Sequence, residues 1–380
     1  MDPSVGGRQV SPGGMTNPRD TAGIGAVPGP GEEGPRRTRI GRLQAPLLRR
    51  RRLGLFLLAV VVLPWLPILG SADDPTLARR VHGIGQAPIL GFEFSPDGAM
   101  IATIQADRRV ALRDAASGLG AASFLVHDGP AQSHAFSPDG RSLALGRFGP
   151  DIVLYDLRAV GAGRLLGVPI RGTKCLAFSP DGRTLAASSH LHNEILLWDL
   201  AAGCERARLQ GHHSPVISLA FAPDGQSLAS GSMNDPAILL WDLSSGRPRR
   251  RLDVPPGPVH SLTYAPDGGM LASAGTFEDP IRLWGQHAGR PDRLIGDHAR
   301  SRNVVAFSPD GRLLATASLS GSVRLWDVST GAELRQVGDP DDRLFGVAFS
   351  PDGRMLAATG TDADIRLWDL AEVLKARTEP

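Results

Sequence analysis

The stretch Ala135–Arg141, AFSPDGR, recurs in some form seven times along the 380-residue chain. Proline fixes φ at the first central position of a tight turn, aspartate bonds back to its own backbone, and glycine supplies a positive φ. Each copy is therefore predicted to be a corner between two strands. Successive copies are 42 or 43 residues apart, and a period this regular indicates an architectural repeat. The aromatic residues of the seven copies are Phe94, Phe136, Phe178, Phe221, Tyr264, Phe307 and Phe349.

Each repeat contains four short runs of strand length. An apolar run such as VISLAF (216–221) precedes the corner, and a small-residue run such as SLASGS (227–232) follows it. A third run such as ILLWD (195–199) comes next, and a weaker fourth run such as RARLQG (206–211) leads towards the next corner. No helical spacing separates these runs, so the sequence predicts an all-β array. One such unit cannot bury both faces of its sheet alone and must stack against its neighbours.

The repeat resembles that of the WD-repeat β-propeller family, in a bacterial-type form with Phe-Ser-Pro-Asp-Gly corners. The family's hallmarks are Trp-Asp at the end of the third strand and Gly-His before the first. The resemblance covers residues 76 to 370 and implies a seven-bladed β-propeller of four-stranded antiparallel blades. The Trp-Asp position is occupied by Arg113-Asp114, Tyr155-Asp156, Trp198-Asp199, Trp241-Asp242, Trp284-Gly285, Trp326-Asp327 and Trp368-Asp369.

The two ends of the repeat array predict how the ring closes. The last unit stops at IRLWDL (365–370) and lacks a fourth strand, whereas TLARRVHGIG (76–85) precedes the first unit with no blade to join. We expect residues 76–85 to pair with the last third strand, because an unpaired strand would leave backbone groups unsatisfied. The tail AEVLKARTEP (371–380) predicts a frayed helix or coil. A chain ending at Leu370 is therefore expected to fold normally.

The first 72 residues differ in composition from the repeats. Residues 1–52 form a Gly- and Pro-rich tail with a basic end, and such a composition is typical of disorder. Residues 53–72 begin with eighteen uncharged residues and end in small residues, which predicts a signal peptide cleaved after Ala72 or a single transmembrane anchor. In both cases the propeller, residues 73–375, should lie outside the cytoplasm, either secreted or membrane-anchored.

Charge is distributed unevenly along the chain. Residues 1–72 hold ten arginines and four acidic residues, so they carry a net charge of +6 and the remainder carries −4. The propeller is therefore not expected to bind nucleic acid. The basic run that includes Arg247, Arg249, Arg250 and Arg251 is interpreted as a charged outer edge that discourages strand pairing. Cys175 and Cys204 fall on separate runs of one repeat and are expected to lie too far apart for a disulfide.

The resemblance implies a buried hydrogen-bond network in one repeat. In the family, the His of the Gly-His pair bonds to an Asp before the third strand, a Ser or Thr on the second strand, and the Trp indole. Here the matching residues are His212, Asp235, either Ser230 or Ser232, and Trp241. The expected role of this set is structural.

The sequence carries no motif for catalysis. It has no Gly-Xaa-Ser-Xaa-Gly elbow and no phosphate-binding loop. His190, His192 and Glu194 are residue types that bind zinc, but no further ligand follows at a diagnostic spacing. We therefore predict no catalytic residue, no metal and no cofactor, in a non-enzymatic interaction scaffold. The alternative is a propeller enzyme, a hydrolase or lyase, acting at the mouth of the central channel.

One face of the ring is predicted to bind the partner. In the family, the turns between second and third strands share a face with the connections into the first strands, opposite the Pro-Asp-Gly corners. Large apolar residues in turns that are otherwise polar, as at positions 148 and 277, suggest a docking patch for a protein or peptide of unknown identity. The candidate residues on this face are Phe148, Arg171, His190, His213, Phe277, Arg300 and Arg302.

Overall fold

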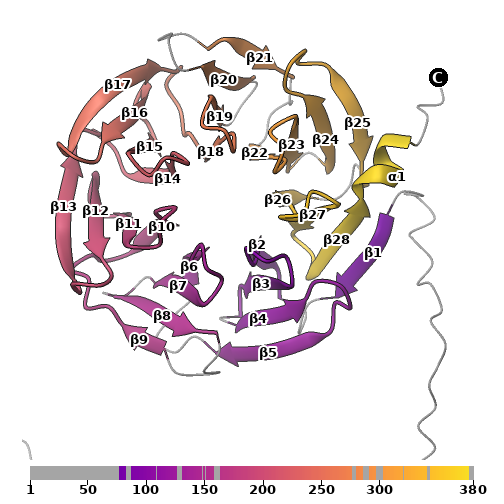
Figure 1. Cartoon of the computed structure of the whole chain (residues 1–380), viewed down its shortest axis with the longest axis horizontal. Coiled ribbons are helices and arrows are strands. Elements are labelled where there is room, and N and C mark those ends of the chain that lie inside the picture. The colour runs from indigo at the N-terminus through magenta and orange to yellow at the C-terminus, as the bar shows by residue number, and fades with distance from the viewer. Residues whose placement is uncertain are drawn as a thin grey trace, which may run out of the picture. The chain divides into compact units, whose positions relative to one another are not determined.

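The computed structural model is a seven-bladed β-propeller of four-stranded antiparallel sheets (Figure 1), so the expected fold class is confirmed. The chain divides into two compact units, Met1–Pro64 and Trp65–Pro380, and every described residue belongs to the second. The tail 1–52 and the apolar segment 53–72 therefore lie outside the described residues. The structure describes residues 77–82, 87–107, 109–125, 131–147, 149, 151–157, 163–275, 280–285, 291–296, 303–319, 321–339 and 343–375.

The blades follow one another in chain order, and each runs from an innermost to an outermost strand. Blade 1 comprises β2 (Ile89–Phe94), β3 (Met100–Gln105), β4 (Arg109–Asp114) and β5 (Gly120–Leu125). Blade 2 comprises β6 (Ala131–Phe136), β7 (Ser142–Arg147), β8 (Ile152–Asp156) and β9 (Gly163–Leu165). Blade 3 comprises β10 (Thr173–Phe178), β11 (Thr184–Ser189), β12 (Glu194–Asp199) and β13 (Cys204–Gln210). Blade 4 comprises β14 (Val216–Phe221), β15 (Ser227–Ser232), β16 (Ala237–Asp242) and β17 (Arg247–Asp253).

The remaining blades complete the ring. Blade 5 comprises β18 (Ser261–Tyr264), β19 (Met270–Ala274), β20 (Ile281–Gly285) and β21 (Arg293–Ile295). Blade 6 comprises β22 (Asn303–Phe307), β23 (Leu313–Ser318), β24 (Gly321–Asp327) and β25 (Glu333–Val337). Blade 7 comprises β26 (Leu344–Phe349), β27 (Met355–Gly360), β28 (Asp364–Asp369) and β1 (Leu77–His82), and the helix α1 (Leu370–Lys375) follows β28.

The Pro-Asp-Gly corners contact one another around the ring. In blade 2, Ser137 Oγ donates to Asp139 Oδ1 at 2.5 Å, and Gly140 has a φ of 66° that favours glycine. A Cβ placed on Gly140 would lie 3.3 Å from Cδ of Pro96 in the preceding corner. The same neighbour relation joins Gly98 to Pro351, Gly182 to Pro138, Gly225 to Pro180, Gly268 to Pro223, Gly311 to Pro266, and Gly353 to Pro309. The corners thus form a closed ring of Pro–Gly neighbours, and for this reason every blade needs the same turn.

The hydrophobic core is divided into layers between neighbouring blades. One layer combines Ile195 and Leu197 of blade 3 with Val216 and Leu239 of blade 4. The second strands contribute small buried residues, and such residues let adjacent sheets approach closely. Five tryptophans of the repeats are buried at 6% exposure or less: Trp198, Trp241, Trp284, Trp326 and Trp368. These indoles supply the largest side chains of the core.

The ring is closed by the N-terminal strand, as predicted. β1 pairs antiparallel with β28, and Val81 lies opposite Ile365 in the register (Figure 1). Blade 7 therefore contains both ends of the repeat array. Such a closure leaves no blade with an unpaired third strand among the described residues.

The C-terminal tail contributes more to the core than its sequence predicts. Leu370 to Lys375 form a short helix, and Val373 is fully buried in the core cluster that contains Leu325 and Trp368. Arg335 Nε also donates to the carbonyl of Val373 at 3.2 Å. The expectation that a chain ending at Leu370 folds normally stays a prediction, and the loss of this burial predicts that such a chain is less stable.

Arginines on outer strands connect neighbouring blades. Arg250 Nη1 donates to the carbonyl of Gly285 at 3.1 Å, and Arg293 Nη1 donates to that of Val328 at 2.7 Å. Arg79 reaches the carbonyl of Ala116 in the same way. The basic run on β17 is therefore more than a charged edge, since Arg250 bridges blades 4 and 5 while its neighbours Arg247, Arg249 and Arg251 are exposed.

The two cysteines do not form a disulfide. Cys175 and Cys204 are both free thiols, and burial raises the pKa of Cys175 to about 11. Within the described ranges, the chain forms no helix that is long and apolar enough to cross a membrane.

Candidate partner-binding face

The loop face is the face formed by the turns between second and third strands and by the connections into the innermost strands. In blades 3 and 4 these segments are 190–193, 233–236, 166–172 and 211–215. Of the seven candidate rim residues, the structure describes Arg171, His190 and His213. Phe148, Phe277, Arg300 and Arg302 lie outside the described residues.

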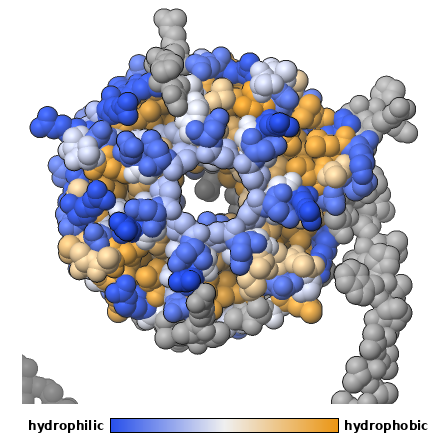
Figure 2. All heavy atoms as spheres, viewed as in Figure 1, coloured by the Kyte–Doolittle hydropathy of each residue, from blue (hydrophilic) through white to orange (hydrophobic). Residues whose placement is uncertain are grey.

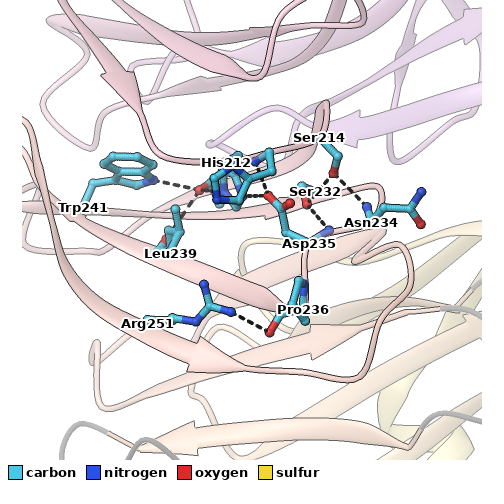
Figure 3. A network of polar contacts seen from close by, with 11 residues as sticks. His212, Ser214, Ser232, Asn234, Asp235, Pro236, Leu239, Trp241 and Arg251 are labelled. Atoms are coloured by element: carbon cyan, nitrogen blue, oxygen red, sulfur yellow. Dashed lines mark hydrogen bonds and ion pairs between the residues drawn. The ribbon is translucent and has the colours of Figure 1, made fainter.

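A buried polar network stands beneath the loop face of blade 4 (Figure 3). His212 Nδ1 lies 2.6 Å from Asp235 Oδ2, and His212 Nε2 lies 2.7 Å from Ser230 Oγ. Trp241 Nε1 donates to the same Ser230 oxygen at 2.7 Å. Burial lowers the pKa of His212, which favours the neutral ring. A neutral ring that donates from Nδ1 to the carboxylate and accepts at Nε2 from the serine hydroxyl satisfies every partner.

The second candidate serine has a different role. Ser232 Oγ accepts the backbone N–H of Asp235 at 3.0 Å and the hydroxyl of Ser214 at 3.0 Å. The structure thus places Ser230 in the imidazole and indole network, and Ser232 in the support of the adjoining turn. The sequence had left these two residues as alternatives.

Asp235 holds the loops of blade 4 together. Its carboxylate accepts the backbone N–H of His213 at 2.9 Å in addition to the bond with His212. Burial alone would raise the pKa of Asp235, but these hydrogen bonds outweigh it and lower the pKa. Met233 N–H also donates to the carbonyl of Pro215 at 2.9 Å. The connection into β14 and the turn before β16 are therefore fixed against each other.

Blades 5 and 6 contain the same indole–hydroxyl bond as this network. Trp284 Nε1 donates to Ser273 Oγ at 2.8 Å, and Trp326 Nε1 donates to Thr316 Oγ1 at 3.0 Å. The sequence signal for both bonds is a Ser or Thr on the second strand, 10 or 11 residues before the tryptophan. The indole–hydroxyl bond is thus a recurring element of the core.

The exposed apolar side chains of the turns are unequally divided between the two faces. Among the described residues eight large hydrophobic side chains are exposed. Three are in turns of this face, Leu191 at 66%, Met233 at 39% and Leu319 at 37%, and Leu90 at 48% lies near the start of the innermost strand β2. Three others lie on outer strands or α1, and Leu119 alone lies in a turn of the corner face. Leu191, Met233 and Leu319 were missed as site residues, although a large apolar residue in such a turn is the signal used for positions 148 and 277.

The three described candidate residues occupy two neighbouring blades. Arg171 is exposed, and its carbonyl accepts the hydroxyl of Ser189 at 2.5 Å. His190 is half-buried beside it, and burial together with the charge of Lys174 lowers its pKa. His213 is exposed on blade 4.

One of the possible zinc ligands of blade 3, Glu194, forms hydrogen bonds within its own blade. The carboxylate of Glu194 accepts from Arg208 and, at 3.2 Å, from Gln210 Nε2. In the part of the chain that the structure describes, no three His, Cys, Asp or Glu side chains are grouped to hold a metal ion.

Two titratable residues lie on the innermost strands between blades 1 and 2. Glu93 stands directly before the repeat aromatic, where the other six repeats have alanine or threonine. Its Oε2 accepts the backbone N–H of Phe136 at 3.0 Å, and burial raises its pKa to about 7. His134 bonds to the backbone of Phe92, and burial lowers its pKa to about 4. Figure 2 shows that the centre of the ring is hollow, with mostly hydrophilic residues around its mouth.

The fold and the tryptophan-centred networks define a WD-repeat-type β-propeller. A family model described as "IFT122 first beta-propeller" matches residues 172–378, which is more than half of the chain. The chain therefore belongs to this family of β-propellers. No curated protein matches the chain.

Proposed function

We propose that this chain is a non-enzymatic interaction scaffold whose loop face docks a protein or peptide partner. The observation that carries the proposal is the difference between the two faces. Three exposed apolar side chains, Leu191, Met233 and Leu319, stand in turns of the loop face, whereas the corners opposite expose charged residues such as Arg312 at 86%. We take the concentration of exposed apolar side chains in the turns of one face as the mark of a binding surface.

The rigidity of the loop face supports the same function. Hydrogen bonds from Met233 to Pro215 and from His213 to Asp235 hold the turns of blade 4 in place before any partner arrives. A surface that is already ordered loses less conformational entropy on binding. The seven Pro-Asp-Gly corners favour a bacterial-type version of the repeat.

The N-terminal sequence supports a location outside the cytoplasm. We propose that residues 53–72 either export the propeller as a cleaved signal or tether it to a membrane. The intact mass of the protein from a membrane fraction distinguishes the two, because cleavage gives a chain that begins at Asp73. Full-length protein recovered as a soluble cytoplasmic species would contradict both.

Site-specific photocrosslinking tests the docking face. A photoreactive amino acid replaces Leu191 on the loop face or Leu119 on the corner face, and intact cells are irradiated. Both positions are well exposed, at 66% and 71%, so they form a matched pair. We expect a discrete crosslinked product from position 191 and none from position 119. The same product from position 119 alone would place the partner on the other face, and purified protein that turns over a hydrolase substrate would contradict the non-enzymatic assignment.

A further inference from the structure

The loop face of blades 3 and 4 combines apolar and basic side chains. Leu191 and Met233 are exposed there, and Arg171, Lys174 and His213 stand on the same segments or at the start of β10. We use "the blade 3–4 surface" for these five residues.

Hydrogen bonds connect the segments of this surface across the two blades. Ser189 joins the turn that carries Leu191 to the carbonyl of Arg171, and His190 N–H donates to Gly172 at 2.9 Å. Ser188 Oγ on β11 donates to the carbonyl of Val216 on β14 at 3.0 Å. Since Val216 directly follows the connection that is bonded to Met233, the two exposed apolar residues belong to adjoining turns.

The carboxylates of Asp235 and Glu194, near this surface, accept hydrogen bonds from neighbouring residues. Asp235 accepts from His212 and from the backbone of His213, and it is only 6% exposed. Glu194 accepts from Arg208 and Gln210. The charge of the blade 3–4 surface is therefore positive, from the exposed Arg171 and the half-buried Lys174. The rest of the propeller is not basic, because residues 73–380 carry a net charge of −4.

We infer that the blade 3–4 surface selects an acidic segment of a partner protein that also carries aliphatic side chains. A positive area on a negative body attracts and orients an acidic ligand, while Leu191 and Met233 accept its apolar groups. The chain's own residues 1–72 are a poor occupant, because their net charge of +6 would be repelled. This inference rests on the proposed function and names the chemistry of its partner.

Fluorescence anisotropy of labelled probe peptides tests the inference on the purified full chain. Three peptides of equal length are used: repeats of Asp-Leu-Glu-Gly, repeats of Lys-Leu-Arg-Gly, and repeats of Asp-Ser-Glu-Gly. We expect the first peptide to bind most tightly and its affinity to fall as salt is raised. The second lacks the negative charge and the third lacks the aliphatic groups, so both should bind more weakly.

Matched variants then locate the binding. We expect the affinity for the first peptide to fall by about five-fold or more in Arg171→Glu, and separately in the double variant Leu191→Ser with Met233→Ser. Arg312→Glu and Leu119→Ser make the same changes on exposed residues of the corner face and should leave the affinity unchanged. Circular dichroism of each variant confirms that the propeller is folded.

The outcomes separate this inference from the proposed function. If the basic or the serine-containing peptide binds as tightly as the first, or if no peptide binds, the acidic–aliphatic preference is wrong. If a peptide of another class binds and is weakened by the Leu191 and Met233 substitutions, the loop face still docks partners and only the preference fails. If only the corner-face variants weaken binding, both the inference and the proposed function are overturned.

Discussion

Replacing Glu93 by glutamine should stabilise the propeller at alkaline pH. The carboxylate accepts the backbone N–H of Phe136 between blades 1 and 2, and burial raises its pKa from 4.5 to about 7. The amide of Glu93→Gln retains an oxygen for this bond but never ionises. The variant therefore removes the cost of a charge at a site that disfavours it.

The magnitude follows from the difference between the two pKa values. Each pKa unit corresponds to about 1.4 kcal/mol, so the full shift corresponds to about 3 kcal/mol. Glu93 keeps part of its surface exposed, and solvent screening reduces this figure, so we expect a gain of about 1 to 3 kcal/mol. Because the pKa of Glu93 is raised in the folded state, the protonated carboxyl contributes fully to the free energy of unfolding of the unmodified chain below pH 4.5. That contribution is lost as the pH rises through 7.

Urea unfolding followed by circular dichroism, at pH 4.5, 6 and 8, measures this dependence. His134 changes stability in the opposite direction, because its lowered pKa costs stability as the pH falls from 6.5 through about 4. That contribution is present in both proteins and cancels in the difference between Glu93→Gln and the unmodified chain. As a control, Glu205→Gln removes a carboxylate from the outer strand β13 and should change the free energy of unfolding by less than about 1 kcal/mol. A difference that is the same at pH 4.5 and pH 8, or a variant that is less stable at pH 8, would refute the reasoning.

Three further predictions concern the core and the ring. His212→Ala leaves buried polar partners unsatisfied and should cost about 1 to 3 kcal/mol in urea unfolding, whereas His213→Ala at the exposed neighbour should cost less than about 0.5 kcal/mol. A chain ending at Leu370 loses the buried Val373 and should be about 1 to 2 kcal/mol less stable than one ending at position 375; equal midpoints would show that α1 is dispensable. Deletion of residues 77–82 leaves the outer edge of β28 unpaired and should abolish a single cooperative transition in calorimetry, and an unchanged transition would contradict the closure by β1.

The fold was predictable because the repeat supplies the same information seven times. The corner signal recurs at a nearly constant period, so strand count and ring closure followed from counting runs, and β1 beside β28 agrees with that count. The burial of helix α1 was harder to predict, since one buried valine in a polar tail carries little pattern. Its burial depends on how blade 6, with Leu325, packs against blade 7, with Trp368, and the tail sequence carries no sign of this contact.

The candidate site was less accessible to sequence reasoning, and the reasons are geometric. Ser230 and Ser232 are two residues apart on β15 and so share one face of the sheet, and only the position of the imidazole separates their roles. Arg250 looked like an ordinary edge residue because its acceptor, Gly285, belongs to another blade. The exposure of Leu191 depends on the path of its turn, and strand periodicity does not determine that path.

A substitution on the corner face should change stability, whereas a substitution on the loop face should change partner affinity. On the corner face each glycine stands against the proline of the preceding blade, so a change at Gly140 affects two blades, and its φ of 66° adds strain for any side chain. On the loop face the exposed side chain of Leu191 projects from a turn bonded to its own blade. Gly140→Ala should therefore lower the free energy of unfolding by about 1 to 2 kcal/mol without changing partner affinity. Leu191→Ser should weaken binding of the partner while changing the free energy of unfolding by less than about 0.5 kcal/mol. If instead Gly140→Ala weakens binding as strongly as Leu191→Ser does, the corners belong to the binding surface, and stability and recognition are not divided between the faces.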